Sequence, residues 1–502
     1  MANSSVTPDT IQPYLRPDLN IEKLLYPIEG DEKVTYDLRY VMVNKSASTV
    51  TLNNLVIFIR FSDQGPFSDS LSYYQDLFNA PTSCSLKNFY MEVSYGQLNI
   101  NSSFYPINTN SSVILSYQDT HPRGYYCKYS ATNPLGYDIS DTEERRNREH
   151  TLLRSAINYV KVQIPSSLNI DSNNDWKVDN ICFVIQGSHD GSGLLWPHRW
   201  ALYTQPTTYI NGKQVYSYNL QLTDYLHYKG VGVLAHEFGH TIGAPDLYHS
   251  GDNDEPVGCW DLMAEEGATP QHPSSYVKKK YMHFIADIPE ISTSGTYTLF
   301  SLSNTSTDNC YKIPIAGSPE YIVLEYRKRI GTYDYVLPYS GLIAMRINPD
   351  STGNYKGLGP GGVNDEIYVF RPDGSTTSQG TLSQAVLSTE YGRDSFFNTS
   401  NPFCFISNGS LGNIFIKNIS SCGDSITFDV RFCDDEDVVI SNTNNVPSNV
   451  NASNNLSTNG SVTITQNDRV TLEAGNSVTL NPGFSVELGG KLNININPCG
   501  DK

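Results

Sequence analysis

Two histidines four residues apart carry the strongest chemical signal in this sequence. His236 and His240 stand in the run His-Glu-Phe-Gly-His, and on a helix that spacing places both imidazoles on one face, one turn apart. Two such rings can bind one Zn²⁺, and Glu237, next to the first of them, can reach a metal-bound water as a general base. The pattern therefore predicts a zinc-dependent hydrolase.

The residues that follow offer a third ligand and a floor for the site. Gly243 stands where a left-handed residue can end the helix, and Asp246 stands where the reversed chain can return a carboxylate to the same metal. Met263, in the turn-like run Gly-Cys-Trp-Asp-Leu-Met-Ala, is expected to lie beneath the histidines as a hydrophobic floor and not as a ligand. The alternatives for the third ligand are His249, Glu265 and Glu266.

Strand and helix patterns alternate in the part of the chain that must position these residues. Val50–Phe61 and Ile181–Ile185 have the apolar character of strands. Helical spacing is expected over Asp141–Val160, Tyr225–Gly243 and Ser274–Phe284. The helix over Tyr225–Gly243 carries both histidines.

The pattern changes after Pro289. Short alternating strands, separated by Gly, Pro, Asn and Ser, predict a β-sandwich. In the tail, four strand-like segments begin eight residues apart, at Val462, Val470, Val478 and Val486. Units this short cannot bury a face alone, so we expect them to stack into a small solenoid-like β-repeat.

These patterns predict an α+β protein with several parts. Residues 49–288 are expected to form the zinc peptidase domain and 289–433 the β-sandwich. Residues 434–460 read as an Asn/Ser-rich linker and 461–502 as the β-repeat module, while no pattern assigns a role to residues 1–48.

The motif region resembles the immune inhibitor A-like family of secreted bacterial metallopeptidases, within the metzincin group. The resemblance rests first on HEFGHTIGAPDLY, GCWDLMA and PSSYVKKKYMHF, and further on LVIFIRFSD, VSYGQL, WPHRW, YIVLEYR and SGLIA, in order over about residues 50–433. It implies a metzincin-like fold, zinc on His236, His240 and Asp246, Glu237 as general base and Met263 as the Met-turn residue. The tail is similar to stacked β modules at the ends of exported Bacteroidetes proteins.

A second metal is predicted in an acidic loop. Asp171, Asn173, Asp175 and Asp179 have the 1, 3, 5, 9 spacing of a calcium loop, although Trp176 replaces the usual glycine and no glutamate stands at position 12. The family resemblance favours a structural calcium here. The alternative is an Asx-rich turn before a strand.

His198, in Trp-Pro-His-Arg-Trp, has two interpretations. It could line the substrate cleft near the zinc, or it could be a packed histidine between two tryptophans.

Composition narrows the functional classes. The chain has 502 residues and a formal charge of −18, so its field repels nucleic acid. The longest aliphatic or aromatic run is Leu55–Ile59, too short for a transmembrane segment. No signal peptide opens the sequence, so the protein is either cytosolic or a mature exported form. Charged residues make up only 17%, as in many extracellular β-rich proteins, and we therefore expect a secreted or cell-surface form, with attachment through the C-terminal module.

The predicted function is therefore a secreted zinc endopeptidase acting on extracellular proteins or peptides. The first alternative is a catalytically silent peptidase fold that serves as an adhesin, but the intact Glu237 argues against it. The second is a zinc hydrolase acting on a non-peptide amide.

Overall fold

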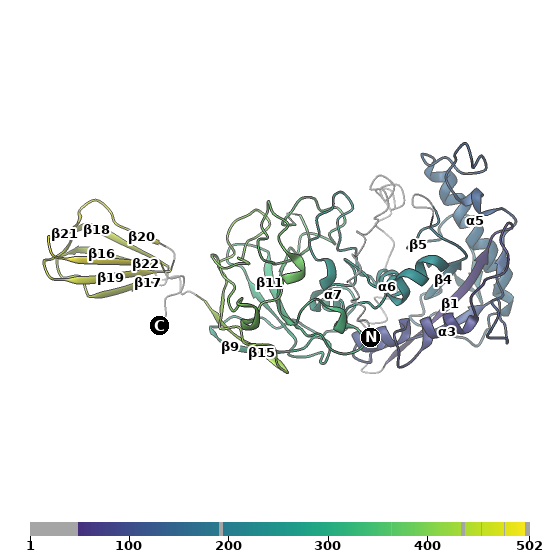
Figure 1. Cartoon of the computed structure of the whole chain (residues 1–502), viewed down its shortest axis with the longest axis horizontal. Coiled ribbons are helices and arrows are strands. Elements are labelled where there is room, and N and C mark those ends of the chain that lie inside the picture. The colour runs from purple at the N-terminus through teal and green to yellow at the C-terminus, as the bar shows by residue number, and fades with distance from the viewer. Residues whose placement is uncertain are drawn as a thin grey trace, which may run out of the picture. The chain divides into compact units, whose positions relative to one another are not determined.

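The computed structural model describes residues 49–189, 194–362, 364–432, 437–452, 454–475 and 477–496. The chain forms two compact units (Figure 1). The first unit extends to Ala286 and includes two later segments, Ile330–Val336 and Gly353–Gly359. The second unit holds the rest. The N-terminal segment 1–48, to which the sequence assigned no role, lies outside the described residues. No described helix is long and apolar enough to cross a membrane.

The first unit is built on a mostly parallel sheet. Its strand order is β2-β1-β4-β8-β5, with β3 also paired to β1, and only β5 is antiparallel to its neighbour. The strands are β1 (Val50–Arg60), β2 (Leu98–Tyr105), β3 (Tyr117–Gln118), β4 (Asn180–Ile185), β5 (His198–Ala201) and β8 (Ser217–Leu222). A two-stranded hairpin, β6 (Tyr209–Ile210) and β7 (Lys213–Gln214), stands apart. Every residue of β4 and β8 is buried. Burial on both faces explains the apolar run of β4, whereas β8 alternates polar and apolar residues although it is equally buried.

Among the described residues, five α-helices belong to this unit. They are α3 (Leu71–Asn79), α4 (Leu86–Val93), α5 (Thr142–Val160), α6 (Thr223–Thr241) and α7 (Ser275–Lys280). Figure 1 labels α3, α5, α6 and α7. A side-chain oxygen caps the N-terminus of four of them, from Ser70, Ser85, Asp141 and Ser274 in turn. The helices expected over Asp141–Val160, Tyr225–Gly243 and Ser274–Phe284 therefore form, the last of them shorter than expected.

Helix α6 is broken at one residue and tightly packed at another. Gly230 has φ +52° and ψ −128°, so the regular turns that carry the histidine motif begin after it. A Cβ on Gly232 would collide with the carbonyl oxygen of Gly267. The chain that leaves the Met263 region thus crosses α6 directly on its backbone, and only glycine allows that approach.

The second unit contains two antiparallel sheets that share one hydrophobic cluster. The first sheet has the order β10-β11-β12-β13 and consists of β10 (Cys310–Pro314), β11 (Tyr321–Arg327), β12 (Gly341–Ile347) and β13 (Ile367–Val369). The second has the order β14-β15-β9 and consists of β14 (Phe415–Lys417), β15 (Ser425–Arg431) and β9 (Gly295–Phe300). Side chains such as Leu324 from one sheet and Phe428 from the other are fully buried in that cluster.

Short 3₁₀ helices complete the described chain at Arg123–Tyr126, Lys161–Gln163, Gly258–Trp260, Asp334–Val336, Leu382–Gln384 and Thr389–Tyr391.

The tail consists of parallel strands in two sheets, β16-β18-β20 with β21 also on β18, and β17-β19-β22. The strands are β16 (Val438–Thr443), β17 (Asn449–Ala452), β18 (Asn455–Ile464), β19 (Arg469–Ala474), β20 (Ser477–Thr479), β21 (Phe484–Val486) and β22 (Lys491–Ile496). Val450 pairs with Leu472 and Leu472 with Ile494, so the chain returns to the same place every 22 residues. The eight-residue spacing seen in the sequence is the step between successive strands of one coil.

The segment 434–460 was expected to be a linker, but its described residues, 437–452 and 454–460, contain β-strands. Strands β16 and β17 and the first half of β18 lie in this range. Apolar residues spaced widely among the Asn and Ser residues, including Ile440, Ala452 and Leu456, form part of the tail's buried core. Most of the polar residues in the described part of this range lie in turns or at exposed positions, although Thr458 is fully buried, and their abundance is why average composition suggested a linker.

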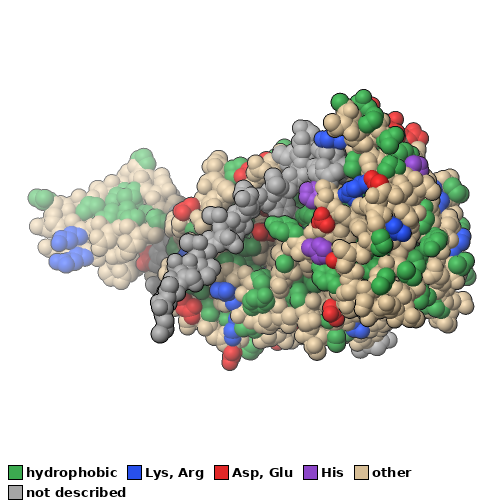
Figure 2. Space-filling view, turned by 45° about the vertical axis from the view of Figure 1, so that its right-hand side comes forward, with side chains coloured by type: hydrophobic (Ala, Val, Ile, Leu, Met, Phe, Trp, Pro, Cys, Tyr) green, Lys and Arg blue, Asp and Glu red, His purple; other side chains and the backbone are tan. Residues whose placement is uncertain are grey.

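Charge is sparse on the surface as well as in the composition. Figure 2 shows one face on which the backbone and side chains that are neither charged nor hydrophobic predominate, with scattered hydrophobic side chains and few acidic or basic groups.

Candidate metal and catalytic site

Three donor atoms from the predicted ligands converge in the first unit. His236 Nε2 and His240 Nε2 lie 3.1 Å apart, and each lies 3.2 Å from Asp246 Oδ1. All three side chains are largely buried. Among the residues that the structure describes, this is the only group of three or more His, Cys, Asp or Glu side chains whose donor atoms come within 4.8 Å of one another.

Main-chain carbonyls fix the orientation of both imidazoles. His236 Nδ1 lies 3.2 Å from the carbonyl oxygen of Leu262, and His240 Nδ1 lies 2.8 Å from that of Ala244. Because a carbonyl only accepts, both Nδ1 atoms carry the proton. In the neutral rings both Nε2 lone pairs then point at the Asp246 carboxylate, as in protein metal sites.

This donor set fits a tetrahedral cation. A zinc ion bonded at about 2.0–2.1 Å to nitrogen and oxygen needs ligand atoms roughly 3.3 Å apart, close to the observed triangle. Apart from its contacts with the two imidazoles, Asp246 Oδ1 is buried with no hydrogen-bond partner among the described residues. Burial alone would raise the pKa of the Asp246 carboxyl, but the two histidines outweigh it and hold that pKa below its ordinary value.

The alternatives for the third ligand lie elsewhere. His249 is fully buried and its Nδ1 contacts Asp252 Oδ1 at 2.8 Å. Glu266 lies 3.8 Å from Lys229 Nζ. Neither these residues nor Glu265 belongs to the described cluster, and Asp246 does.

Glu237 lies inside the same buried region. Its side chain is 7% exposed, and its main-chain oxygen accepts a hydrogen bond from Asn219 Nδ2 at 3.0 Å, which ties this turn of α6 to strand β8. Burial raises the pKa of the Glu237 carboxyl, although the neighbouring histidines oppose this. A raised pKa suits a carboxylate that must take up a proton.

Met263 packs against the helix that carries the histidines. It is fully buried, and a Cβ placed on Gly239 would come 2.6 Å from its Sδ atom. The Asp261 carboxylate holds this turn by accepting from the main-chain N–H groups of Met263 and Ser274 at 2.8 and 2.7 Å. The Met263 carbonyl in turn accepts from the N–H of Leu247, next to Asp246, at 2.8 Å.

The segment that contains this site matches a known protein family. Residues 184–279, which include the whole metal cluster, match the model of the immune inhibitor A peptidase M6 catalytic domain. This segment is a metallopeptidase domain similar to that of the immune inhibitor A family. Immune inhibitor A of Bacillus thuringiensis subsp. alesti is 31% identical to it over 90 residues, which cover 16% of this chain and only 12% of that relative.

Solved structures give a weaker likeness. Two crystal forms of wild-type OgpA from Akkermansia muciniphila align with 62% of this chain and with 89% and 88% of theirs. The sequence identities are 12% and 13%, and both TM-scores are 0.25.

His198, for which the sequence left open a place in the substrate cleft or a packed position between two tryptophans, is held by two other residues. Its Nε2 lies 3.0 Å from Glu149 Oε1 and its Nδ1 lies 2.7 Å from the carbonyl oxygen of Trp196. Tyr218 donates its hydroxyl to the same Glu149 oxygen. Burial alone would lower the pKa of His198, but Glu149 reverses this and raises it, while the pKa of Glu149 is lowered. With both ring nitrogens occupied, the geometry favours the packed histidine over a cleft residue.

The predicted calcium residues are only partly brought together. Asn173, Asp175 and Asp179 line one small pocket. Asp171 instead pairs with Lys213 and accepts from the N–H of Asp175 at 2.9 Å. In the metallopeptidase domain as described, these carboxylates form no cluster like that of the two histidines and Asp246.

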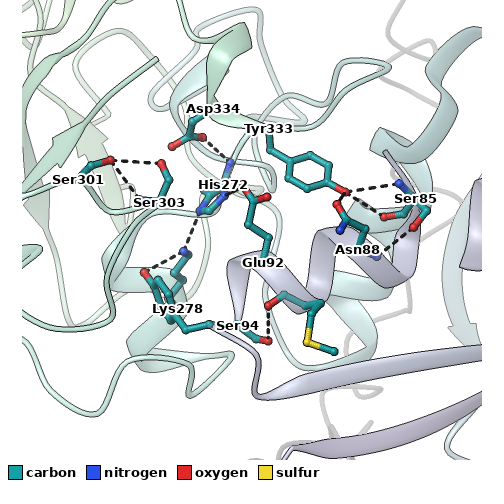
Figure 3. A network of polar contacts seen from close by, with 12 residues as sticks. Ser85, Asn88, Glu92, Ser94, His272, Lys278, Ser301, Ser303, Tyr333 and Asp334 are labelled. Atoms are coloured by element: carbon teal, nitrogen blue, oxygen red, sulfur yellow. Dashed lines mark hydrogen bonds and ion pairs between the residues drawn. The ribbon is translucent and has the colours of Figure 1, made fainter. Parts of the chain in front are cut away.

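A buried polar network that the sequence did not reveal supports the metallopeptidase domain from the side of α4 (Figure 3). His272 Nε2 lies 3.1 Å from Glu92 Oε1, and Lys278 Nζ lies 3.0 Å from His272 Nδ1. From the inserted segment Ile330–Val336, Tyr333 donates to Asn88 Oδ1 at 2.8 Å, and Asp334 accepts from the His272 N–H at 2.9 Å. No spacing rule links residues this far apart in sequence.

Proposed function

We propose that the protein is a zinc-dependent endopeptidase. The observation that carries this proposal is the convergence of His236 Nε2, His240 Nε2 and Asp246 Oδ1 on one point. Three ligands in this arrangement are typical of a catalytic zinc site, since they leave a coordination position open. The match to a metallopeptidase family over the same residues supports the proposal.

His236, His240 and Asp246 would hold the ion, with Met263 below them. When bound, zinc supplies a Lewis acid that activates water and polarises the scissile carbonyl. Glu237 would accept a proton from the attacking water and then donate it to the leaving amine. The Leu262 and Ala244 carbonyls would keep the imidazoles aligned throughout.

The finer assignments also belong to this proposal. We place the enzyme among the metzincins, since Met263 follows the histidine helix in sequence and lies against it in space. Its substrates would be extracellular proteins or peptides, and it would act as a secreted or cell-surface enzyme. The solenoid-like tail would serve as a spacer or attachment module. A structural calcium in the Asp171–Asp179 loop is part of the same proposal, and its effect on the melting temperature can be measured separately from zinc binding.

The proposal is tested by zinc content and casein cleavage on three forms of the full chain. The unsubstituted chain should bind about one zinc and cleave casein, with activity lost on chelation and restored by zinc. Glu237→Ala should keep the zinc and lose about 10²–10⁴-fold in rate. His240→Ala should lose both. Full activity in Glu237→Ala would overturn the mechanism, and zinc without cleavage in the unsubstituted chain would favour the silent adhesin.

A further inference from the structure

The third proposed ligand is supported differently from the other two. His236 and His240 lie on α6, whose backbone hydrogen bonds fix their positions. Asp246 lies beyond the end of the helix, in a loop without regular secondary structure. A carboxylate on such a loop stays within 3.2 Å of both imidazoles only if other contacts hold its main chain.

Asn354 supplies two of those contacts. Its main-chain N–H donates to the carbonyl oxygen of Asp246 at 2.8 Å, and its side-chain Nδ2 donates to the carbonyl oxygen of Leu247 at 3.1 Å. The two bonds grip the peptide units on the carboxyl side of the ligand. Asn354 is 1% exposed, so water does not compete for these carbonyls.

The residues on either side of Asn354 also contact the loop that carries Asp246. Gly353 has φ +64°, and a Cβ there would lie 2.8 Å from the Asp246 carbonyl oxygen and 2.9 Å from Pro245 Cβ. The carbonyl oxygen of Tyr355 accepts from both the N–H and the hydroxyl of Ser250, at 3.1 and 2.8 Å. The segment Gly353–Gly359 thus lies along the ligand loop, although it falls between β12 and β13 in sequence.

We propose that Asn354 is a positioning residue for the metal ligand Asp246. This inference rests on the proposed function, because it takes Asp246 to bind zinc. Asn354 touches neither the metal nor a substrate. It holds the Asp246 main chain so that the carboxylate lies between the two histidines, and therefore the segment 353–359 is needed for full metal affinity.

The test measures zinc dissociation constants by chelator competition, and absorption spectra after cobalt substitution, on the full chain. Asn354→Ala removes the bond to Leu247 and should weaken zinc binding about 10–100-fold, as other changes behind a metal ligand do. The visible cobalt bands should also shift, because they respond to the geometry of the carboxylate ligand. The matched control is Asn309→Ala, since Asn309 is also 1% exposed and also donates its side-chain amide to a main-chain carbonyl, that of Thr305 in the second unit.

Gly353→Ala gives an independent test that keeps Asn354. Its control is Gly392→Ala, since Gly392 has φ +65° but open space around its Cβ position, so backbone strain is matched and the contact with Asp246 is not. We expect Gly353→Ala to weaken zinc binding and Gly392→Ala to leave it unchanged.

The outcomes separate this inference from the proposed function. If the unsubstituted chain binds no zinc, the proposed function fails. If it binds zinc and Asn354→Ala and Gly353→Ala keep the same affinity and cobalt spectrum, the positioning role is wrong even if both variants melt earlier. Should Asn354→Ala fail to fold, Gly353→Ala against Gly392→Ala decides.

Discussion

Met263 lies with its sulfur so close to Gly239 that a Cβ on the glycine would come 2.6 Å from Sδ. Gly239 directly precedes His240 on α6, and Met263 directly follows Leu262, whose carbonyl orients His236. The floor of the site and its ligand helix are therefore in contact through a pair in which a larger residue at position 239 would force the Met263 side chain to move.

Gly239→Ala should destabilise the fold by about 1–3 kcal/mol, because the added methyl overpacks the contact with Met263. In the double variant with Met263→Ala, the space left by the methionine should recover part of that cost, so the double change should cost less than the sum of the single ones. Denaturant unfolding of the four proteins measures this. Gly65→Ala, where nothing lies within 4 Å of the Cβ position, is the control, and strict additivity would contradict the contact.

Zinc affinity of the metal-free protein should rise with pH. Burial alone would lower the pKa of His236, but its hydrogen bond with Asp246 and the nearby acidic groups raise it to about 10. Below that value a proton must leave before the nitrogen can bind metal, so the dissociation constant should fall about tenfold per pH unit. Calorimetric titration at pH 6, 7 and 8, in buffers of different ionisation enthalpy, should detect the released proton. A dissociation constant independent of pH would refute it.

The Glu149–His198 pair should stabilise the fold most at mildly acidic pH. The lowered pKa of Glu149 stabilises the fold above its ordinary value of 4.5, and this is lost as pH falls through the folded value. The raised pKa of His198 stabilises the fold below its ordinary value of 6.5, and this is lost as pH rises through the folded value. The pair is therefore fully effective between these two ordinary values.

Glu149→Gln should cost about 3–5 kcal/mol in that window, because it leaves a buried imidazolium without its partner. The loss should shrink at higher pH, where His198 becomes neutral. Thermal unfolding of both proteins from pH 4 to pH 9 checks this, and an equal loss at every pH would show that the charge of the pair does not matter.

Asp179 offers a test of the calcium proposal. Burial, with Asp171 and Asp175 nearby, raises its pKa to about 6. Its ionised form therefore opposes folding above that pH in the absence of a cation, by up to ~3 kcal/mol. Asp179→Asn should raise the melting temperature in calcium-free buffer at pH 7.5 and lower it relative to the unsubstituted chain in millimolar calcium. If calcium leaves the melting temperature of the unsubstituted chain unchanged, the calcium assignment is wrong.

The sequence alone determined the local part of the candidate site. A spacing of four residues fixes His236 and His240 on one helix face whatever surrounds them. The short step through Gly243 limits where Asp246 can go. The apolar strands expected at Val50–Phe61 and Ile181–Ile185 were also predictable, because burial on one or both faces imposes a pattern on consecutive residues.

Tertiary structure alone decided how that site is supported. Asn354 meets Leu247 across 107 residues, and Tyr333 meets Asn88 across 245. Asn354 and Tyr333 lie outside the helices and strands, and no period or spacing connects either residue to its partner. The structure of the tail also depends on contacts between distant residues. Its strands stack on residues 22 positions away and bury a few apolar side chains, which are too sparse in the Asn/Ser-rich range 434–460 to predict strands there. A site whose residues lie within a few helical turns can be predicted from their spacing in the sequence. Contacts between distant segments can be identified only in the folded structure.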